Sequence, residues 1–268
     1  MHTVLIGSIA FFLYLIAAIL LGLRLGRRLT ASNIKWQALG ISFAAVSLHG
    51  WLVFELLFTS TGLNLGIFNA VSLILWFVSF LLIFSSLTQP TENLGIIVFP
   101  SAALTIGIAG AFGNEQHITN TLGTTIEIHI LISIMAYSLL SIAAVQAILL
   151  AIQDKHLRNK QPGGFIRALP PLQTMEGLLF QMIAVGFTLQ CLSLISGIVF
   201  LENIFAQHLV HKTVLSIIAW VVFAILLWGR WRFGWRGRTA IRWTFGGFIA
   251  LVLSYVGSKV VLEVILGR

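Results

Sequence analysis

Three histidines, His49, His129 and His211, lie where their side chains could bind a metal ion or the iron of a haem. Each lies within or at the edge of an apolar stretch, where an ionisable group is costly and is therefore a candidate functional residue. Imidazole is the usual axial ligand of haem iron and a common ligand of divalent metals. His129 and His211 would face one another if their stretches are neighbours. The alternatives are a neutral His49 hydrogen-bonded to a neighbouring helix, and interface histidines that are merely solvated.

The other reactive residue types indicate no enzymatic chemistry. Cys191 is the only cysteine, so the chain has no disulfide or CxxC redox pair, and Cys191 is expected to pack as a small apolar residue. Glu55 and Glu127 lie near the ends of apolar stretches, and Glu176 is expected in a first helical turn, where a negative charge suits the helix dipole. No HExxH, GxSxG or P-loop motif occurs, so metalloprotease, rhomboid-like and NTPase functions lack their residues. We expect a protein that is not an enzyme.

The elements that must position these residues are membrane spans. The chain is 58% hydrophobic and 9% charged, with a mean hydropathy of +1.00, which excludes an ordinary soluble domain. About eight apolar stretches reach the length of ~20 residues that a spanning helix needs. They cover roughly residues 3–22, 37–58, 66–87, 95–112, 126–152, 175–200, 213–231 and 239–265. The sequence therefore predicts an all-α bundle of about eight transmembrane helices that forms a single integral membrane domain over residues 1–268.

The basic residues predict the orientation of this bundle. When alternate loops are assigned to opposite sides, 13 of the 16 Lys and Arg residues fall on one side. They are Arg24, Arg27, Arg28, Lys35, Lys155, Arg158, Lys160, Arg167, Arg230, Arg232, Arg236, Arg238 and Arg242. Cytoplasmic loops carry the excess of Lys and Arg, so both termini are expected outside, in the periplasm of a Gram-negative cell. The formal charge of +8 then reflects contact with lipid head groups, and no nucleic-acid partner is expected.

Three local patterns add detail. Pro170-Pro171 predicts that a loop ends against the start of the sixth span. Residues 229–242, rich in Arg and Trp, suggest a short stretch lying in the head-group layer. In the fourth span, Gly107, Gly110 and Gly113 are expected to form a face for close helix packing; a broken helix at Pro100 that forms a transport site would show a similar pattern.

From about His129 onward the sequence resembles the cytochrome c assembly family typified by CcsA and CcmC, in its HemX/YpjD-like branch. The resemblance is strongest over about 127–268. It rests on three matches. The first is Glu127-Ile128-His129-Ile130-Leu131, and the second is Leu169-Pro170-Pro171-Leu172-Gln173-Thr174-Met175-Glu176, followed by Gly186-Phe187-Thr188-Leu189 and Ser196-Gly197. The third is His211-Lys212-Thr213-Val214-Leu215-Ser216, with Trp220 and the segment from Gly229 to Arg238.

The resemblance implies haem held or passed at the outer face, with histidines as axial ligands and a tryptophan-rich outer loop as platform. By position, His129 and His211 match histidines of the family pattern, and His49 resembles its intramembrane histidine. The chain departs from the pattern at two places. Residues 201–208 contain no Trp, and the histidine expected near the last span is missing around Tyr255. These departures indicate a protein other than the ligation enzyme itself.

The leading interpretation is a multi-pass protein of the bacterial inner membrane that binds or relays haem through His49, His129 and His211. A competing interpretation is an accessory subunit that binds no haem and partners another inner-membrane protein, such as an ion transporter or an enzyme of haem synthesis. A small secondary transporter would need a polar path through the bundle, for which the sequence offers only Pro100, His49 and Glu55.

Overall fold

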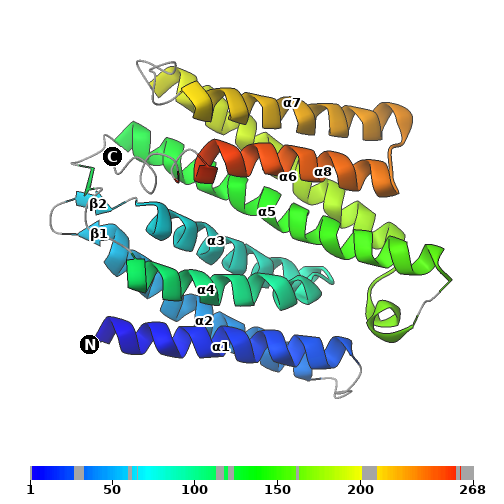
Figure 1. The fold of residues 1–268 in the computed structure, drawn as a ribbon, viewed down its shortest axis with the longest axis horizontal. Coiled ribbons are helices and arrows are strands. Elements are labelled where there is room, and N and C mark those ends of the chain that lie inside the picture. The colour runs from blue at the N-terminus through cyan, green and yellow to red at the C-terminus, as the bar shows by residue number, and fades with distance from the viewer. Residues whose placement is uncertain are drawn as a thin grey trace. The chain divides into compact units, whose positions relative to one another are not determined.

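The computed structural model describes residues 2–26, 33–59, 62–64, 66–112, 118–119, 124–160, 163–200, 210–257 and 260. Within these ranges, eight helices are long and apolar enough to cross a membrane (Figure 1). They are α1 (His2–Leu25), α2 (Ile34–Leu57), α3 (Ile67–Thr88), α4 (Gly95–Phe112), α5 (Thr124–Arg158), α6 (Leu172–Phe200), α7 (Val210–Phe233) and α8 (Gly237–Val252), the last of which reaches spanning length with the turn that continues it to Gly257. The predicted all-α membrane fold is confirmed, and the orientation of its termini stays a prediction.

The remaining elements are short. Strands β1 (Phe58–Thr59), β2 (Gly62–Asn64) and β3 (Ile118–Thr119) pair antiparallel in that order. Two 3₁₀ turns, η1 (Glu92–Leu94) and η2 (Gly164–Ala168), precede α4 and α6, and a π-helical turn, η3 (Leu253–Gly257), continues α8.

The chain divides into two compact units. The first comprises Met1–Thr121 and Asn159–Pro170, and therefore carries α1 to α4. The second comprises Leu122–Arg158 and Pro171–Arg268, and carries α5 to α8. The single domain predicted over residues 1–268 stays a prediction.

In the first unit, α1 packs against both α2 and α4. The buried side of α1 is built largely from small residues, Gly7, Ala10, Ala17 and Ala18, around a fully buried Tyr14. Small residues let helix backbones approach closely. Within a membrane, helices associate through such close packing, because lipid provides no hydrophobic driving force between them. The result is a tight packing of α1 around a single buried phenol.

In the second unit, α5 packs along α6, and α8 lies against both α5 and α7. Gly186 of α6 faces Leu140 of α5 so closely that a Cβ atom there would lie 2.8 Å from the Leu140 Cγ. Gly247 of α8 meets the ring of Phe223 in the same way, with an added Cβ 2.8 Å from Cζ. These two glycines set how closely their helices approach.

Two of the local expectations are wrong. Residues 229–242 form no separate interfacial stretch, because α7 continues to Phe233 and only Gly234–Arg236 separate it from α8. Gly234 provides the turn with a φ of +65°, which favours glycine.

On α4, Gly107 and Gly110 have no atom within 4 Å of an added Cβ, so they form no packing face, and Gly113 lies outside the described residues. By contrast, α6 does begin at Leu172, directly after Pro170-Pro171.

Candidate functional site

The interface between α5 and α6 is polar near the start of α5 and the end of α6. His129 Nδ1 lies 2.8 Å from the Oγ of Ser196, and one turn along, the Oγ atoms of Ser133 and Ser193 lie 2.7 Å apart. As numbers rise along α5 they fall along α6, so the two helices are antiparallel. Residues 129, 133 and 137 recur every fourth position and so share one face of α5. This face meets the matching serine face of α6.

The Ser196 hydroxyl lies between two acceptors. Its Oγ is 2.8 Å from Nδ1 of His129 and 2.9 Å from the backbone oxygen of Ser193. If Ser196 donates its single hydrogen to Ser193, its Oγ accepts from Nδ1 and Nε2 keeps its lone pair; if it donates to Nδ1, Nε2 carries the hydrogen. Ser196 orients the ring in both tautomers, and the first is the one in which Nε2 can bind a metal.

A second group of polar residues lies on the same side of α5, around the π-helical turn. Ser254 donates to the backbone oxygen of Lys212 at 2.8 Å, and its Oγ lies 2.7 Å from that of Ser216. The phenol of Tyr137 reaches the same Ser254 at 3.4 Å. Single π-helical turns often occur at functional sites, because the extra residue redirects a side chain inward. Here η3 joins α5 to α7 through one serine.

Gln190 of α6 completes this polar region. Its Nε2 donates to the backbone oxygen of Ser216 at 3.2 Å, and the residue is only 4% exposed. Its Oε1 accepts no hydrogen bond from any described residue. An unsatisfied buried acceptor costs free energy, so this oxygen is suited to a donor from outside the chain. Nearby, Trp220 donates to the Sγ of Cys191 at 3.0 Å, which agrees with a cysteine that packs and does not react.

The structure places the three predicted histidines differently. His129 is half-buried beside Ser196, within the polar face just described. His211 is the second residue of α7 in the same unit, but its side chain lies outside the described residues. His49 belongs to the other unit. Among the residues that the structure describes, no three His, Cys, Asp or Glu side chains are grouped to hold a metal ion.

His49 lies on α2 in a closed polar cluster and is 0% exposed. Its Nδ1 is 3.2 Å from the Tyr14 hydroxyl, and its Nε2 is 2.9 Å from the Ser72 Oγ. Either tautomer satisfies both contacts, because each hydroxyl can donate or accept. Both ring nitrogens are therefore engaged within the bundle. This arrangement favours a structural role, and the prediction of His49 as a haem contact stays a prediction that requires one of these bonds to break.

His49 is one member of a longer buried polar seam. On α2, Lys35, Ser42 and His49 recur every seven residues, as Ser72, Ser79 and Ser86 do on α3. Ser42, Ser79 and Ser86 are all 0% exposed. Helices that cross at a small angle keep residues seven apart facing the same partner, so this spacing aligns the two polar rows. Sequence reasoning missed this seam, although the seven-residue spacing was there to be found.

The seam ends at a buried carboxylate that sequence reasoning also missed. Glu92 of η1 accepts from Arg24 of α1 at 3.0 Å, and its second oxygen lies 3.5 Å from the Nζ of Lys35. The Glu92 side chain is 7% exposed, so its charge depends on both cations for compensation. One carboxylate thus holds together the end of α1, the start of α2 and the turn before α4.

Comparison with known proteins gives a consistent result. The family model described as "Cytochrome C assembly protein" matches residues 9–266. The inner membrane protein YpjD of Escherichia coli (strain K12) is 33% identical over 207 residues, which cover 76% of this chain and 78% of YpjD. Protein HemX of Brevibacillus brevis is 22% identical over 48% of each chain. The cytochrome c biogenesis protein CcsA of Chlamydomonas reinhardtii is 27% identical over 50% of this chain and 38% of its own. No solved structure matches.

Proposed function

Because the chain belongs to the cytochrome c assembly protein family, we propose that it is a haem-handling protein of the bacterial inner membrane, with His129 as an axial ligand of the haem iron. We further propose that it acts without being an enzyme, since the tryptophan-rich outer loop of the family pattern is absent from residues 201–208. The observation that carries the proposal is the half-buried imidazole of His129, whose Nδ1 lies 2.8 Å from the Ser196 Oγ, so that Ser196 orients the ring.

The residues around His129 fit an axial ligand well. A histidine that binds a metal through one nitrogen commonly donates the hydrogen of the other to an oxygen, which fixes the ring orientation. Ser196 supplies that oxygen at 2.8 Å. Haem, when bound, would supply an iron centre whose ligation depends on the surrounding ligands and polarity. The chain's own contribution is to orient the His129 ring through Ser196, and Nε2 would bind the iron in the tautomer in which Nδ1 donates to Ser196.

The rest of the polar face would serve the same ligand. His211, the second residue of α7 in the same unit, is the candidate for a second ligand that would hold the haem iron. The free Oε1 of Gln190 could accept a hydrogen bond from a bound water or ligand. Apolar residues such as Phe187 and Trp220, whose rings stack 5.8 Å apart, provide flat surface in the same helices.

Chemical rescue tests the axial role of His129. In a His129→Gly variant loaded with haem, the absorption bands of histidine-ligated iron are expected to disappear and then to return when imidazole is added. The matched control is His156→Gly, at the other end of α5, where Nδ1 contacts the backbone oxygen of Ile152. The control is expected to keep the spectrum of the unmodified protein. If imidazole leaves the spectrum of His129→Gly unchanged, another group ligates the iron.

A further inference from the structure

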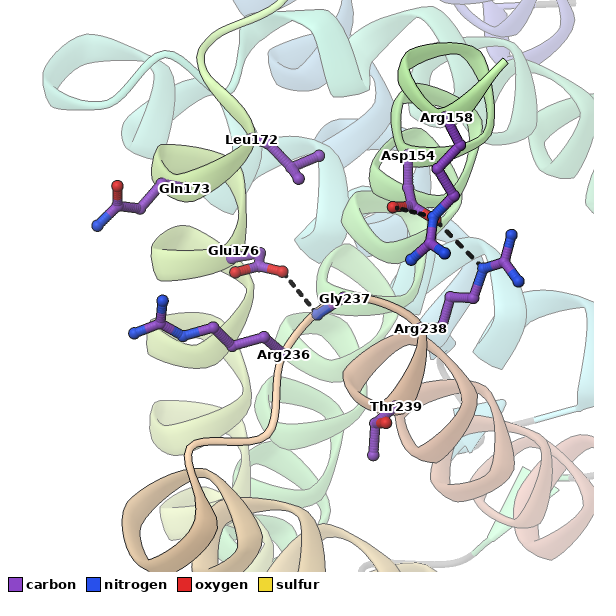
Figure 2. Close-up of a pocket in the computed structure, with 9 residues that line it drawn as sticks. All are labelled: Asp154, Arg158, Leu172, Gln173, Glu176, Arg236, Gly237, Arg238 and Thr239. Atoms are coloured by element: carbon purple, nitrogen blue, oxygen red, sulfur yellow. Dashed lines mark hydrogen bonds and ion pairs between the residues drawn. The ribbon is translucent and has the colours of Figure 1, made fainter. Parts of the chain in front are cut away.

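At one end of the second unit, a cavity of about 590 Å³ opens between α5, α6 and α8 (Figure 2). Its lining comes from three segments that are distant in the sequence. These residues are Asp154, Arg158, Leu172, Gln173, Glu176, Arg236, Gly237, Arg238 and Thr239. Three of the nine are arginines and two are carboxylates, so the lining carries a net positive charge.

Asp154 arranges two of the arginines. The Nε of Arg158 lies 3.0 Å from Oδ1 of Asp154, and the Nε of Arg238 lies 3.4 Å from Oδ2 (Figure 2). Asp154 itself is only 13% exposed in its side chain, whereas the two arginines are 53% and 57% exposed. One carboxylate thus engages the Nε of both guanidinium groups. The terminal nitrogens of both remain open, with no bond to a described residue.

The second carboxylate of the cavity is also occupied. Glu176 Oε1 accepts a hydrogen bond from the backbone N–H of Gly237, which begins α8 (Figure 2). The expectation that Glu176 stabilises the first turn of its own helix is therefore corrected, since α6 begins four residues earlier and the carboxylate acts on α8 instead. Because this N–H is taken, the anion affinity of the cavity comes from its guanidinium groups. Arg236 is a third, exposed cation of the lining, but its side chain points away from the guanidinium groups of Arg158 and Arg238 (Figure 2).

The surroundings place this cavity at the level of lipid head groups. Trp228, Trp231 and Phe233 at the end of α7 are 58%, 76% and 67% exposed. Large aromatic side chains exposed at the end of a membrane span are typical of the interface between hydrocarbon and water. Arginine is suited to phosphate there because its planar fork donates two parallel hydrogen bonds to a pair of oxygens.

From these observations we infer that Arg158 and Arg238 form a binding site for the phosphodiester of an anionic phospholipid, with Asp154 as the residue that positions both of them. The guanidinium groups grip the phosphate while the acyl chains extend along the apolar surface of the unit. This site is independent of His129 and of haem.

The test counts lipids that stay bound to the detergent-purified full chain in native mass spectrometry. Phosphatidylglycerol and phosphatidylcholine are offered at equal concentration, and the Arg158→Gln/Arg238→Gln variant is compared with Arg232→Gln/Arg242→Gln. The control pair removes the same charge from α7 and α8 but lines no part of the cavity. Each basic contact near an anionic lipid surface contributes about fivefold in affinity, so the cavity variant is expected to bind phosphatidylglycerol about 25-fold more weakly. The control is expected to bind as the unmodified protein does.

Three results would overturn the inference. Equal retention of phosphatidylcholine, which carries the same phosphodiester without a net charge, would show that the site does not select an anionic lipid. An equal loss of phosphatidylglycerol in the control pair would show that the effect comes from general surface charge. Displacement of phosphatidylglycerol by an equal concentration of inorganic phosphate would assign the site to a soluble anion. Arg158→Gln alone leaves Asp154 paired with Arg238, so it tests the same site if the double variant fails to fold, with an expected loss of about fivefold.

Discussion

Replacing Ser196 with Ala is expected to weaken haem binding about 10- to 100-fold, which is the usual effect of removing a residue that orients a metal-binding histidine. The Ser196 Oγ lies 2.8 Å from Nδ1 of His129 and would accept its hydrogen in the tautomer that binds a metal through Nε2. Without it the ring can rotate, and the hydrogen can move to Nε2 and occupy the position needed by the iron. The dissociation constant for haem, measured by absorption titration of the purified variant, gives this effect directly.

Ser133→Ala is the matched control for this substitution. Ser133 and Ser193 form the next rung of the same interface, and the Ser133 Oγ contacts the Ser193 hydroxyl and the backbone oxygen of His129 but not its ring. Haem affinity in Ser133→Ala is expected to stay within a few-fold of the unmodified protein. An equal loss in both variants would mean that the serines act by holding α5 to α6, and the orienting role of Ser196 would then be rejected.

Replacing His49 with Ala is expected to destabilise the protein by about 2–4 kcal/mol and to leave haem binding per folded molecule unchanged. The imidazole joins Tyr14 and Ser72, and all three residues are at most 2% exposed. Its removal leaves two buried hydroxyl groups short of a partner and opens a cavity between α1, α2 and α3. The upper end of the range is limited because hydrogen bonds between membrane helices are individually modest.

The measurement is the free energy of unfolding in mixed detergent micelles, together with the haem content of the folded fraction. His2→Ala is a suitable control, because His2 is exposed at the start of α1 and its loss is expected to change stability little. Loss of haem from folded His49→Ala protein would contradict the structural role and support the alternative, in which His49 contacts haem after its bond to Ser72 breaks.

The membrane architecture could be predicted from the sequence because its cause is local. A run of about 20 apolar residues spans the bilayer whatever its neighbours are, and Pro170-Pro171 identifies the start of α6 by steric exclusion alone. The ends of the helices were harder to predict from the sequence. The Arg- and Trp-rich segment at 229–242 was expected to form a short stretch in the head-group layer, but α7 incorporates it as far as Phe233. Arginine and tryptophan are compatible with a helix, so composition alone does not end one.

The partners of the site residues could not be predicted, because they depend on which helices are neighbours. His129 was identified by its residue type, whereas Ser196 lies 67 positions away and is an ordinary residue of α6. The same holds for Arg238 and Asp154, which are 84 positions apart. The seam of Lys35, Ser42 and His49 is different, since its seven-residue spacing is visible in the sequence and indicates one buried polar face.

The buried polar groups of both units include satisfied and unsatisfied members. In the first unit, His49 is hydrogen-bonded at both ring nitrogens and Glu92 pairs with Arg24 and Lys35. Asn69 Oδ1 in the first unit and Gln190 Oε1 in the second each accept no hydrogen bond from a described residue. Such acceptors are costly in a buried region unless a ligand or water satisfies them. The expectation of a ligand in the second unit therefore rests on His129 beside Ser196 and not on unsatisfied acceptors alone.

The most direct test of this account is the absorption spectrum of the detergent-purified protein with and without added haem, recorded beside a His129→Ala/His211→Ala double variant. The account predicts a Soret band in the unmodified protein that the double variant loses while it remains folded. A protein that stays colourless and takes up no haem would contradict the account. It would leave a membrane accessory protein of the same family, whose partner must then be found by co-purification.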